Sequence, residues 1–460
     1  MTHNGYKSPF AFDMAVHEVV LQIQPRGFLI DKEVQAKFID QARKDWVEYQ
    51  RFLDFTAMKH VNVNSAPQMQ QLFYGDYGLR KRTNTKIIKG VKKKVVTTDE
   101  TALRSIMVEC REKLAALKTK SAMERYALAL TCAACVLRIR AVRKMLSSYL
   151  EIDIDSDGKI RSTLSVGGAD NGRFTSSKTL WGTGCNLQTI PRKLRKMFIA
   201  DEGWELAEFD LNRGESWIYS HLAEDFEMMD IHHSGRDFHA ETGAAITSAF
   251  GLDPLSPDFI SENEKTDDRC YFIRYMGKRV NHASAYKMGP GKQQEVVNEE
   301  ADETGITISF GQSKEAQLLW KQKYPGMPMW WDRVEQKMNK DRILENCFGR
   351  RHVFHEFFGD SLFRKAVSWE PSSTSVDYMN LGMLRVFNAL DRGTGDYIKL
   401  LHQNHDSIVV TYPIELRDEV VPQIIDLIED DIVVNGYKIR VPVEGGYGHS
   451  WGELKKWKAA

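Results

Sequence analysis

Two aspartates that end or interrupt strand-like apolar runs are the first residues of this sequence that could do chemistry. Asp210 closes the run 204–210 (WELAEFD), and Asp406 lies in the polar tip of 399–412 (KLLHQNHDSIVVTY), which predicts a β-hairpin. Two such carboxylates brought together could hold a pair of Mg²⁺ ions, because hard divalent ions prefer oxygen ligands. Ions about 3.5–4 Å apart stabilise both the attacking and the leaving oxygen of an in-line phosphoryl displacement. The alternative for either aspartate alone is a turn residue that caps its own backbone.

A third segment, 274–286 (RYMGKRVNHASAY), has a cation or a ring at every fourth position. Positions four apart are neighbours on a helix, so Arg274, Lys278, His282 and Tyr286 are predicted to form one slowly drifting stripe. Two cations followed by two flat rings can hold a triphosphate at one end and stack on a base at the other. A solvated cationic face is the alternative, but it explains the rings poorly.

With these segments the chain resembles the polymerase portion of the family A DNA polymerases, the bacterial DNA polymerase I and related phage enzymes. Asp210 with Glu215 resembles the first catalytic motif of that family, the segment 274–286 its nucleotide-binding motif, and His405 with Asp406 its third motif. Other segments that resemble the family in the expected order are NVNS at 62–65, GRFTSS at 172–177, NLQTIP at 186–191, GRDFH at 235–239, YPG at 324–326, FGRR at 348–351 and VPV at 441–443.

The resemblance implies an α+β fold, the right-hand polymerase fold with an antiparallel palm sheet, helical fingers and a helical thumb. Helical apolar spacing over 12–60 and 99–150 agrees with a thumb on either side of a basic segment. The expected parts are 1–150 for the N-terminal segment and thumb, 151–235 for the first part of the palm, 236–369 for the fingers and 370–460 for the second part of the palm.

The resemblance further implies template-directed DNA synthesis, in which deoxynucleotides are added to a primer 3′-hydroxyl and pyrophosphate is released. Asp210 and Asp406 would hold two Mg²⁺ ions. The residues that match nucleotide-contacting positions of the family are Glu215, His239, Arg274, Lys278, His282 and Tyr286. The residues expected to contact the primer end or the duplex are Arg173, Gln188, Gln403 and His405.

Charge is balanced overall, with 63 basic and 63 acidic residues, but it is unevenly distributed. The segment 80–94 (RKRTNTKIIKGVKKK) has no acid, and its polar residues predict a loop. The resemblance places this loop in the thumb, where Lys92, Lys93 and Lys94 would contact DNA phosphates with a strong salt dependence. A solvated basic loop or a localisation tract is the alternative.

Composition favours an intracellular globular protein without a membrane segment, and the resemblance implies primer-template DNA and deoxynucleoside triphosphates as its partners. The sequence has no run of about 20 apolar residues and no signal-like start. Cys132 and Cys135 form a CxxC inside a helical pattern and are expected to be packed thiols. Separate replication proteins are further candidate partners, and the drifted motifs and compact length favour a phage origin. No second carboxylate cluster precedes the thumb-like sequence, so proofreading is not expected.

Three departures from the family pattern keep two other functions open. Ser407 stands where most members have Glu, His282 where they have Phe or Tyr, and 370–375 lacks an expected Gln-Gly. Single-subunit RNA polymerases also have Ser after the third-motif Asp, whereas Glu215 with Tyr286 favours DNA synthesis by crowding the sugar 2′ position. A catalytically degenerate protein that only binds primer-template DNA is the second alternative. His282 is also expected either to become protonated beside a triphosphate at lower pH or to be a ring that only fills the same space as the family's aromatic residue.

Overall fold

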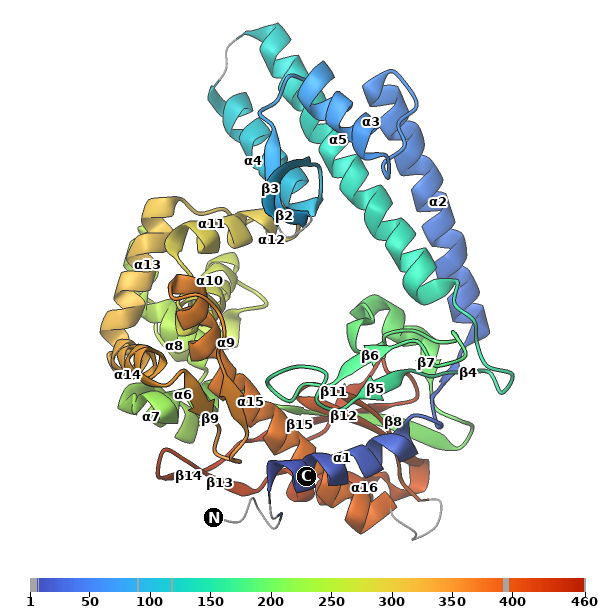
Figure 1. Cartoon of the computed structure of the whole chain (residues 1–460), viewed down its shortest axis with the longest axis vertical. Helices are drawn as coiled ribbons and strands as arrows, with labels where there is room; N and C mark the ends of the chain where they lie inside the picture. Colours follow the sequence, from blue (N-terminus) through green and yellow to red (C-terminus); the bar gives the residue numbers. More distant parts are fainter. Residues whose placement is uncertain (1–5, 7, 89–90, 117–118, 392–396, 459–460) are drawn as a thin grey trace. The chain divides into compact units, whose positions relative to one another are not determined.

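The computed structural model describes residue 6 and residues 8–88, 91–116, 119–391 and 397–458 (Figure 1). The chain forms two compact units. The larger unit consists of Met1–Ile30 and Asp153–Ala460, and the smaller unit consists of Asp31–Ile152. The described residues before Asp31 therefore belong to the same unit as the two aspartates.

The centre of the larger unit is a five-stranded antiparallel sheet in the order β11-β12-β8-β15-β16. Successive side chains of a strand point to opposite faces. Ala207, Phe209 and Leu211 of β8 join the hydrophobic core, so Glu208 and Asp210 lie on the other face. The predicted α+β class with an antiparallel sheet is confirmed. The strands are β8 (Trp204–Leu211), β11 (Lys399–Asn404), β12 (Ser407–Pro413), β15 (Val443–Gly448) and β16 (Lys455–Lys456).

Three helices pack against the apolar side of this sheet: α1 (Pro9–Ile23), α15 (Asp360–Val386) and α16 (Arg417–Ile428). The side chain of Ser8 caps α1 by accepting from the Ala11 N–H at 3.2 Å. Helix α16 turns an apolar face toward the sheet, and its buried side chains include Val420 and Ile424. This packing leaves the carboxylate-bearing face of β8 free of the helical layer.

Most of the helices that lie between β8 and α15 in the chain pack around a second hydrophobic core. Helices α8 and α10 approach so closely that a Cβ on Gly277 would lie 2.1 Å from the His239 carbonyl oxygen. A side chain at this position would clash with the backbone, so glycine is required there. The helices are α6 (Gly214–Ala223), α7 (Phe226–His233), α8 (Phe238–Ala245), α9 (Pro257–Asn263), α10 (Asp268–Ala285), α11 (Pro290–Glu299), α12 (Ala301–Thr304), α13 (Phe310–Lys323) and α14 (Gly326–Lys340).

The smaller unit packs its helices around a core that includes Leu53, Ile106 and Ile139. Cys132 and Cys135 are buried in this core, as expected for packed thiols. The basic segment expected as a loop is instead a β-hairpin, because its Thr, Ile and Val residues favour paired strands. The elements are α2 (Lys32–Ala57), α3 (Ala66–Gln70), η1 (Gln71–Asp76), β2 (Arg82–Ile88), β3 (Val91–Thr97), α4 (Glu100–Ala116), α5 (Lys120–Met145) and η2 (Leu146–Leu150).

Short strands and helical turns complete the larger unit. No helix in the described ranges is both long and apolar enough to span a bilayer. The remaining elements are β1 (Phe28–Ile30), β4 (Lys159–Ile160), β5 (Thr163–Ser165), β6 (Thr175–Ser177), η3 (Leu187–Thr189), η4 (Arg192–Met197), β7 (Phe198–Ile199), η5 (Thr247–Phe250), β9 (Ile343–Glu345), β10 (Arg351–Val353), η6 (Phe387–Asp391), η7 (Ile414–Leu416), β13 (Asp431–Val434) and β14 (Tyr437–Arg440).

Candidate active site

The hairpin of β11 and β12 brings Asp406 beside Asp210. Ser407 pairs with Asp210 in the β12–β8 register, and the Leu211 N–H donates to the Asp406 carbonyl oxygen at 3.1 Å. The turn contains only His405 and Asp406, since Asn404 and Ser407 are already paired. His405 has a φ of 63°, in the left-handed region that few residues other than glycine adopt. A strained two-residue turn thus holds Asp406 at the end of β8.

Asp210 lies in a negatively charged environment. Asp210 lies near the end of β8 and is solvent-exposed. The protein around its carboxyl group nevertheless disfavours the charged form. This desolvation, together with the nearby charge of Asp406, raises the pKa of Asp210 to about 7. The carboxylates of Glu208 and Glu444 add to the rise, and Arg192 opposes it. Carboxylates that repel one another in this way are suited to binding a divalent cation.

The carboxylates present are compatible with Mg²⁺, which needs few protein ligands. Among the side chains that the structure describes, no three or more of His, Cys, Asp and Glu are grouped as a metal site. Mg²⁺ commonly takes one or two carboxylates and completes its octahedral shell with substrate phosphates and water. Asp210 and Asp406 offer those two carboxylates.

Glu208 lies beside Ser407 and is a site residue that sequence reasoning missed. The Ser407 hydroxyl donates to Glu208 Oε1 at 3.1 Å. Arg195 Nη1 donates to Oε2 at 3.1 Å, and Trp451 Nε1 donates to the same oxygen at 3.1 Å. A carboxylate from β8 therefore occupies the neighbourhood of Ser407. The available signal was the spacing, since residues two apart on a strand share a face.

Glu444 is the second missed residue. It pairs with Asp210 across β15, accepts from Asn212 Nδ2 at 2.8 Å and forms an ion pair with Lys456 at 3.0 Å. Nothing in the local sequence around Glu444 indicates this position, because it depends on the register of β15 against β8.

A hollow of about 690 Å³ adjoins the end of β8. It brings together three of the predicted nucleotide-contacting residues, His239, Arg274 and Lys278. Arg274 donates from Nε to Asp237 at 2.7 Å and from Nη1 to Glu264 at 2.8 Å. The hollow has the size and the cations that a triphosphate requires. Its other lining residues are Asn212, Arg213, Ser234, Gly235, Arg236, Asp237, Asp258, Ser261, Glu262 and Glu444.

Two histidine rings, His239 of α8 and His282 of α10, lie close to each other near these cations. The rings of His239 and His282 are 6.0 Å apart between centroids. Burial, and then the charge of His282, lower the pKa of His239 to about 3. Desolvation and the cations Lys278 and Arg279 lower the pKa of His282 below its usual value. Both rings thus have pKa values below that of a free histidine in the protein without a triphosphate, and protonation of His282 beside a bound triphosphate stays a prediction.

Tyr286 and Glu215 meet at the far end of the stripe. The Tyr286 hydroxyl donates to one Glu215 oxygen, and Arg173 Nη2 donates to the other at 3.1 Å. Burial and the Glu215 charge raise the pKa of Tyr286 well above its usual value, so the phenol stays protonated as the donor. The first and second predicted motifs are therefore joined through one carboxylate.

The predicted primer-side residues gather at the Asp406 hairpin. Gln188 Nε2 donates to the Gln403 carbonyl oxygen at 3.1 Å, and Gln403 Nε2 donates to the His405 carbonyl oxygen at 2.7 Å. The buried His405 Nδ1 has no hydrogen-bond partner within the described residues. An unpaired ring nitrogen beside Asp406 is available for a ligand.

The three predicted DNA-binding lysines belong to the smaller unit and lie on β3. Lys92, Lys93 and Lys94 pair with Ile87, Lys86 and Thr85 of β2. Because strand side chains alternate, Lys92 and Lys94 share one face of the hairpin and Lys93 lies on the other.

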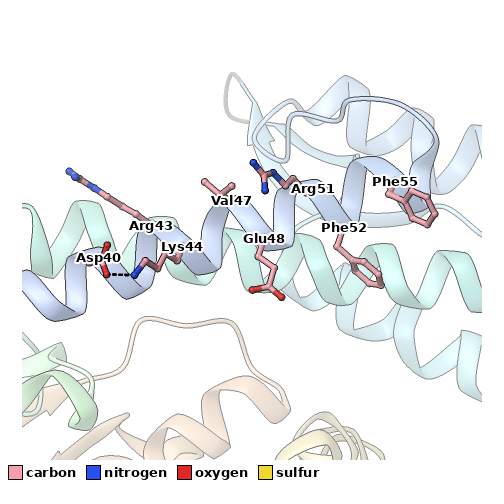
Figure 2. A pocket seen from close by; sticks show the side chains of 8 residues that line it. All are labelled: Asp40, Arg43, Lys44, Val47, Glu48, Arg51, Phe52 and Phe55. Carbon is pink, nitrogen blue, oxygen red and sulfur yellow. Dashed lines mark ion pairs between the residues drawn. The ribbon is translucent and has the colours of Figure 1, made fainter.

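The hollow on helix α2 in the smaller unit has a different character (Figure 2). Its volume is about 740 Å³, and exposed Val47, Phe52 and Phe55 lie there among charged residues of the same helix, including Asp40 and Lys44. Asp40 and Lys44 form an ion pair with each other at 2.6 Å. The hollow on α2 is lined by none of the predicted catalytic residues. The hollow beside β8 is therefore the candidate substrate site.

Paired carboxylates on an antiparallel sheet, next to a hollow lined with cations, are the arrangement of a nucleotide-polymerising palm. The chain belongs to DNA polymerase family A, whose model matches residues 32–453. The predicted right-hand polymerase fold is confirmed by this match and by a structural neighbour. That neighbour is the POL domain of Pol1 from M. smegmatis in complex with DNA primer-template and dNTP, which aligns with a TM-score of 0.71 and 20% identity over 96% of this chain and 70% of that chain.

Curated relatives include a thermostable DNA polymerase I of Thermus filiformis and the DNA polymerase I of Helicobacter pylori. The first is 24% identical over 95% of this chain and 47% of its own length. The second is 23% identical over 95% of this chain and 43% of its own length. The chain therefore spans less than half the length of these two relatives.

Proposed function

We propose that this chain catalyses template-directed DNA synthesis, adding deoxynucleotides to a primer 3′-hydroxyl with release of pyrophosphate. The observation that carries the proposal is the pairing of Asp210 with Asp406 next to a hollow that presents Arg274 and Lys278. The solved neighbour is titled as a complex with primer-template DNA and dNTP. With such substrates, the proposed activity would serve DNA replication or repair inside a cell.

Asp210 and Asp406 would hold two Mg²⁺ ions. When bound, the ions supply activation of the 3′-hydroxyl and neutralise charge on the triphosphate. Arg274 and Lys278 would hold the phosphates, for which Arg274 exchanges carboxylate partners for phosphate oxygens. Gln188, Gln403, His405 and Arg173 would position the primer end. Residues 31–152 would serve as the thumb, 236–369 as the fingers, and the sheet as the palm.

The hydrogen bond between Tyr286 and Glu215 favours DNA over RNA synthesis. It closes the space beside the position proposed for the sugar and is held from the other side by Arg173. Ser407 is the feature that the chain shares with single-subunit RNA polymerases. The Glu208 carboxylate lies beside Ser407, so the site keeps a carboxylate near the position where most family A members have Glu.

Primer extension with deoxy- or ribonucleotides tests this function against both alternatives. We expect extension with deoxynucleotides and Mg²⁺, and none after chelation. Asp406→Ala should abolish extension while primer-template binding stays measurable, whereas Asp332→Ala, an exposed carboxylate on α14, should extend normally. Efficient ribonucleotide extension would favour an RNA polymerase. Binding without any extension would favour the degenerate protein.

We also propose that the 460-residue chain does not shorten mismatched primers. The family match over 32–453 assigns nearly all of it to polymerase parts. Metal-dependent shortening of a mismatched primer in the absence of nucleotides would contradict this. Separate replication proteins as partners and a phage origin stay predictions.

A further inference from the structure

A loop between β6 and η3 presents two large apolar side chains to solvent. In this Trp181 loop (residues 178–186), Leu180 is 92% exposed and Trp181 is 86% exposed. The tip is closed by the Thr179 N–H donating to the Thr183 carbonyl oxygen at 3.0 Å and by a 2.8 Å contact between the two threonine hydroxyls. The exposed side chains therefore project from a short, hydrogen-bonded turn.

The loop is anchored on both sides to the candidate active site. Before it, Arg173 donates to Glu215 at 3.1 Å, and after it, Gln188 donates to the Gln403 carbonyl oxygen at 3.1 Å. At its base the Leu187 N–H donates to Ser176 Oγ at 3.3 Å. The Trp181 loop thus emerges between two segments that are proposed to contact the primer.

Charge around the loop points to an anionic partner. Isolated exposed apolar residues are common on proteins, so exposure alone identifies no ligand. The segment 171–196, however, has no acidic residue in a chain whose charges balance. Its cations Lys178, Arg192 and Lys193 are exposed and have no ion-pair partner in the part of the chain that the structure describes. Aromatic side chains among unpaired cations are the pattern of single-stranded nucleic-acid binding.

A groove of about 630 Å³ adjoins the loop and has room for a nucleoside. Arg161 in its wall is paired with Asp155 at 2.6 Å and Asp157 at 2.5 Å, so the groove suits an uncharged base better than a phosphate. Its lining includes Gln24, Thr163, Thr179, Trp181 and Thr183, whose amide and hydroxyl groups can hydrogen-bond to a base edge.

We propose that the Trp181 loop binds an unpaired nucleotide of the DNA substrate. Trp181 stacks on the base beside the groove, and Lys178 with Arg192 and Lys193 attracts the backbone phosphates. The nucleotide comes either from the single-stranded template overhang or from a frayed primer end. The inference rests on the proposed function only in taking DNA as the ligand.

Binding in chelator without nucleotides tests the proposal independently of catalysis. Full-length Trp181→Ala, Trp181→Phe and the control Phe357→Ala, an aromatic 92% exposed elsewhere, are titrated with oligo(dT), a blunt duplex and a primer-template. Trp181→Ala should weaken binding of oligo(dT) and primer-template about 5- to 150-fold, the range for loss of one base–aromatic stack. Trp181→Phe should keep most of the affinity, and blunt-duplex binding and the control should change less than about twofold.

Stacking is read directly from 2-aminopurine placed in the template overhang or at a mismatched primer end. We expect quenching at one of these positions, which identifies the source of the nucleotide, and its loss in Trp181→Ala. Equal weakening of blunt-duplex binding would indicate a groove contact and overturn the stacking proposal. Unchanged affinity for all three DNAs would show that the loop is not a DNA contact. Wild-type protein that binds these DNAs with quenching but does not extend primers would refute the proposed function and leave this inference standing.

Discussion

Replacing Asp210 by Asn should stabilise the metal-free protein while abolishing nucleotide addition. The folded protein raises the pKa of Asp210 to about 7 by desolvation and by neighbouring carboxylates. In the unfolded chain an Asp titrates near 3.9. The folded state therefore binds more protons between these values. The stability that this proton affinity contributes is complete below about pH 4 and is lost as the pH rises through 7.

The magnitude follows from the size of the shift. About three pH units at about 1.4 kcal/mol each would give roughly 4 kcal/mol at pH 8. Asp210 is an exposed residue, so solvent screening reduces this figure. We expect Asp210→Asn to gain about 1–2 kcal/mol at pH 8, and less than half of that at pH 5, where the wild-type carboxyl is protonated.

Urea unfolding in chelator at pH 5 and pH 8 measures this gain, with Asp332→Asn as the exposed control. Adding Mg²⁺ at pH 8 should narrow the difference, because a ligand that binds only the folded wild type stabilises it. A variant that is no more stable than wild type at pH 8, or a gain that is equal at both pH values, would refute the electrostatic account of the site.

Four further outcomes are expected. Glu215→Ala should raise the incorporation of ribonucleotides relative to deoxynucleotides, because it removes the carboxylate that holds Tyr286 at the proposed sugar site. The measurement is the ratio of the kcat/KM values for the two sugars. An unchanged ratio would show that other residues select the sugar. His282→Phe should discriminate more strongly against dideoxynucleotides than the natural enzyme in competition assays. Because the pKa of His282 is lowered, the selectivity of the natural enzyme for deoxy- over dideoxynucleotides should be the same at pH 7 and pH 8. Identical selectivity of the two proteins would show that the ring only fills space. Replacing lysines 92–94 by Gln should flatten the slope of log affinity against log salt by about 2, since only two of them share a hairpin face, and an unchanged slope would return the hairpin to a solvated role. Glu208→Gln should lower kcat and Ser407→Glu in that background should restore part of it, because the hydroxyl and the carboxylate are already 3.1 Å apart; no recovery would show that the two positions are not interchangeable.

Local sequence was sufficient to place the main chemical groups on the correct elements. Apolar runs on either side of a polar tip are a property of consecutive residues, so the hairpin that carries Asp406 could be recognised from them. A spacing of four residues likewise predicted that Arg274, Lys278 and His282 lie on one stripe of a helix, which is α10. The same local reasoning failed for the basic segment, whose β-branched residues pair as strands.

Only the tertiary structure determines which charged groups surround Asp210. Its partner Glu444 comes from β15 and its partner Asp406 from the turn between β11 and β12. The registers of these strands against β8 are set by long-range pairing that no short motif specifies. Glu208 acquires its place beside Ser407 by the same pairing. The pKa of Asp210 is therefore a property of three strands assembled together. The sequence determines which residues are acidic, but these carboxylates repel one another only when the sheet forms and brings them together.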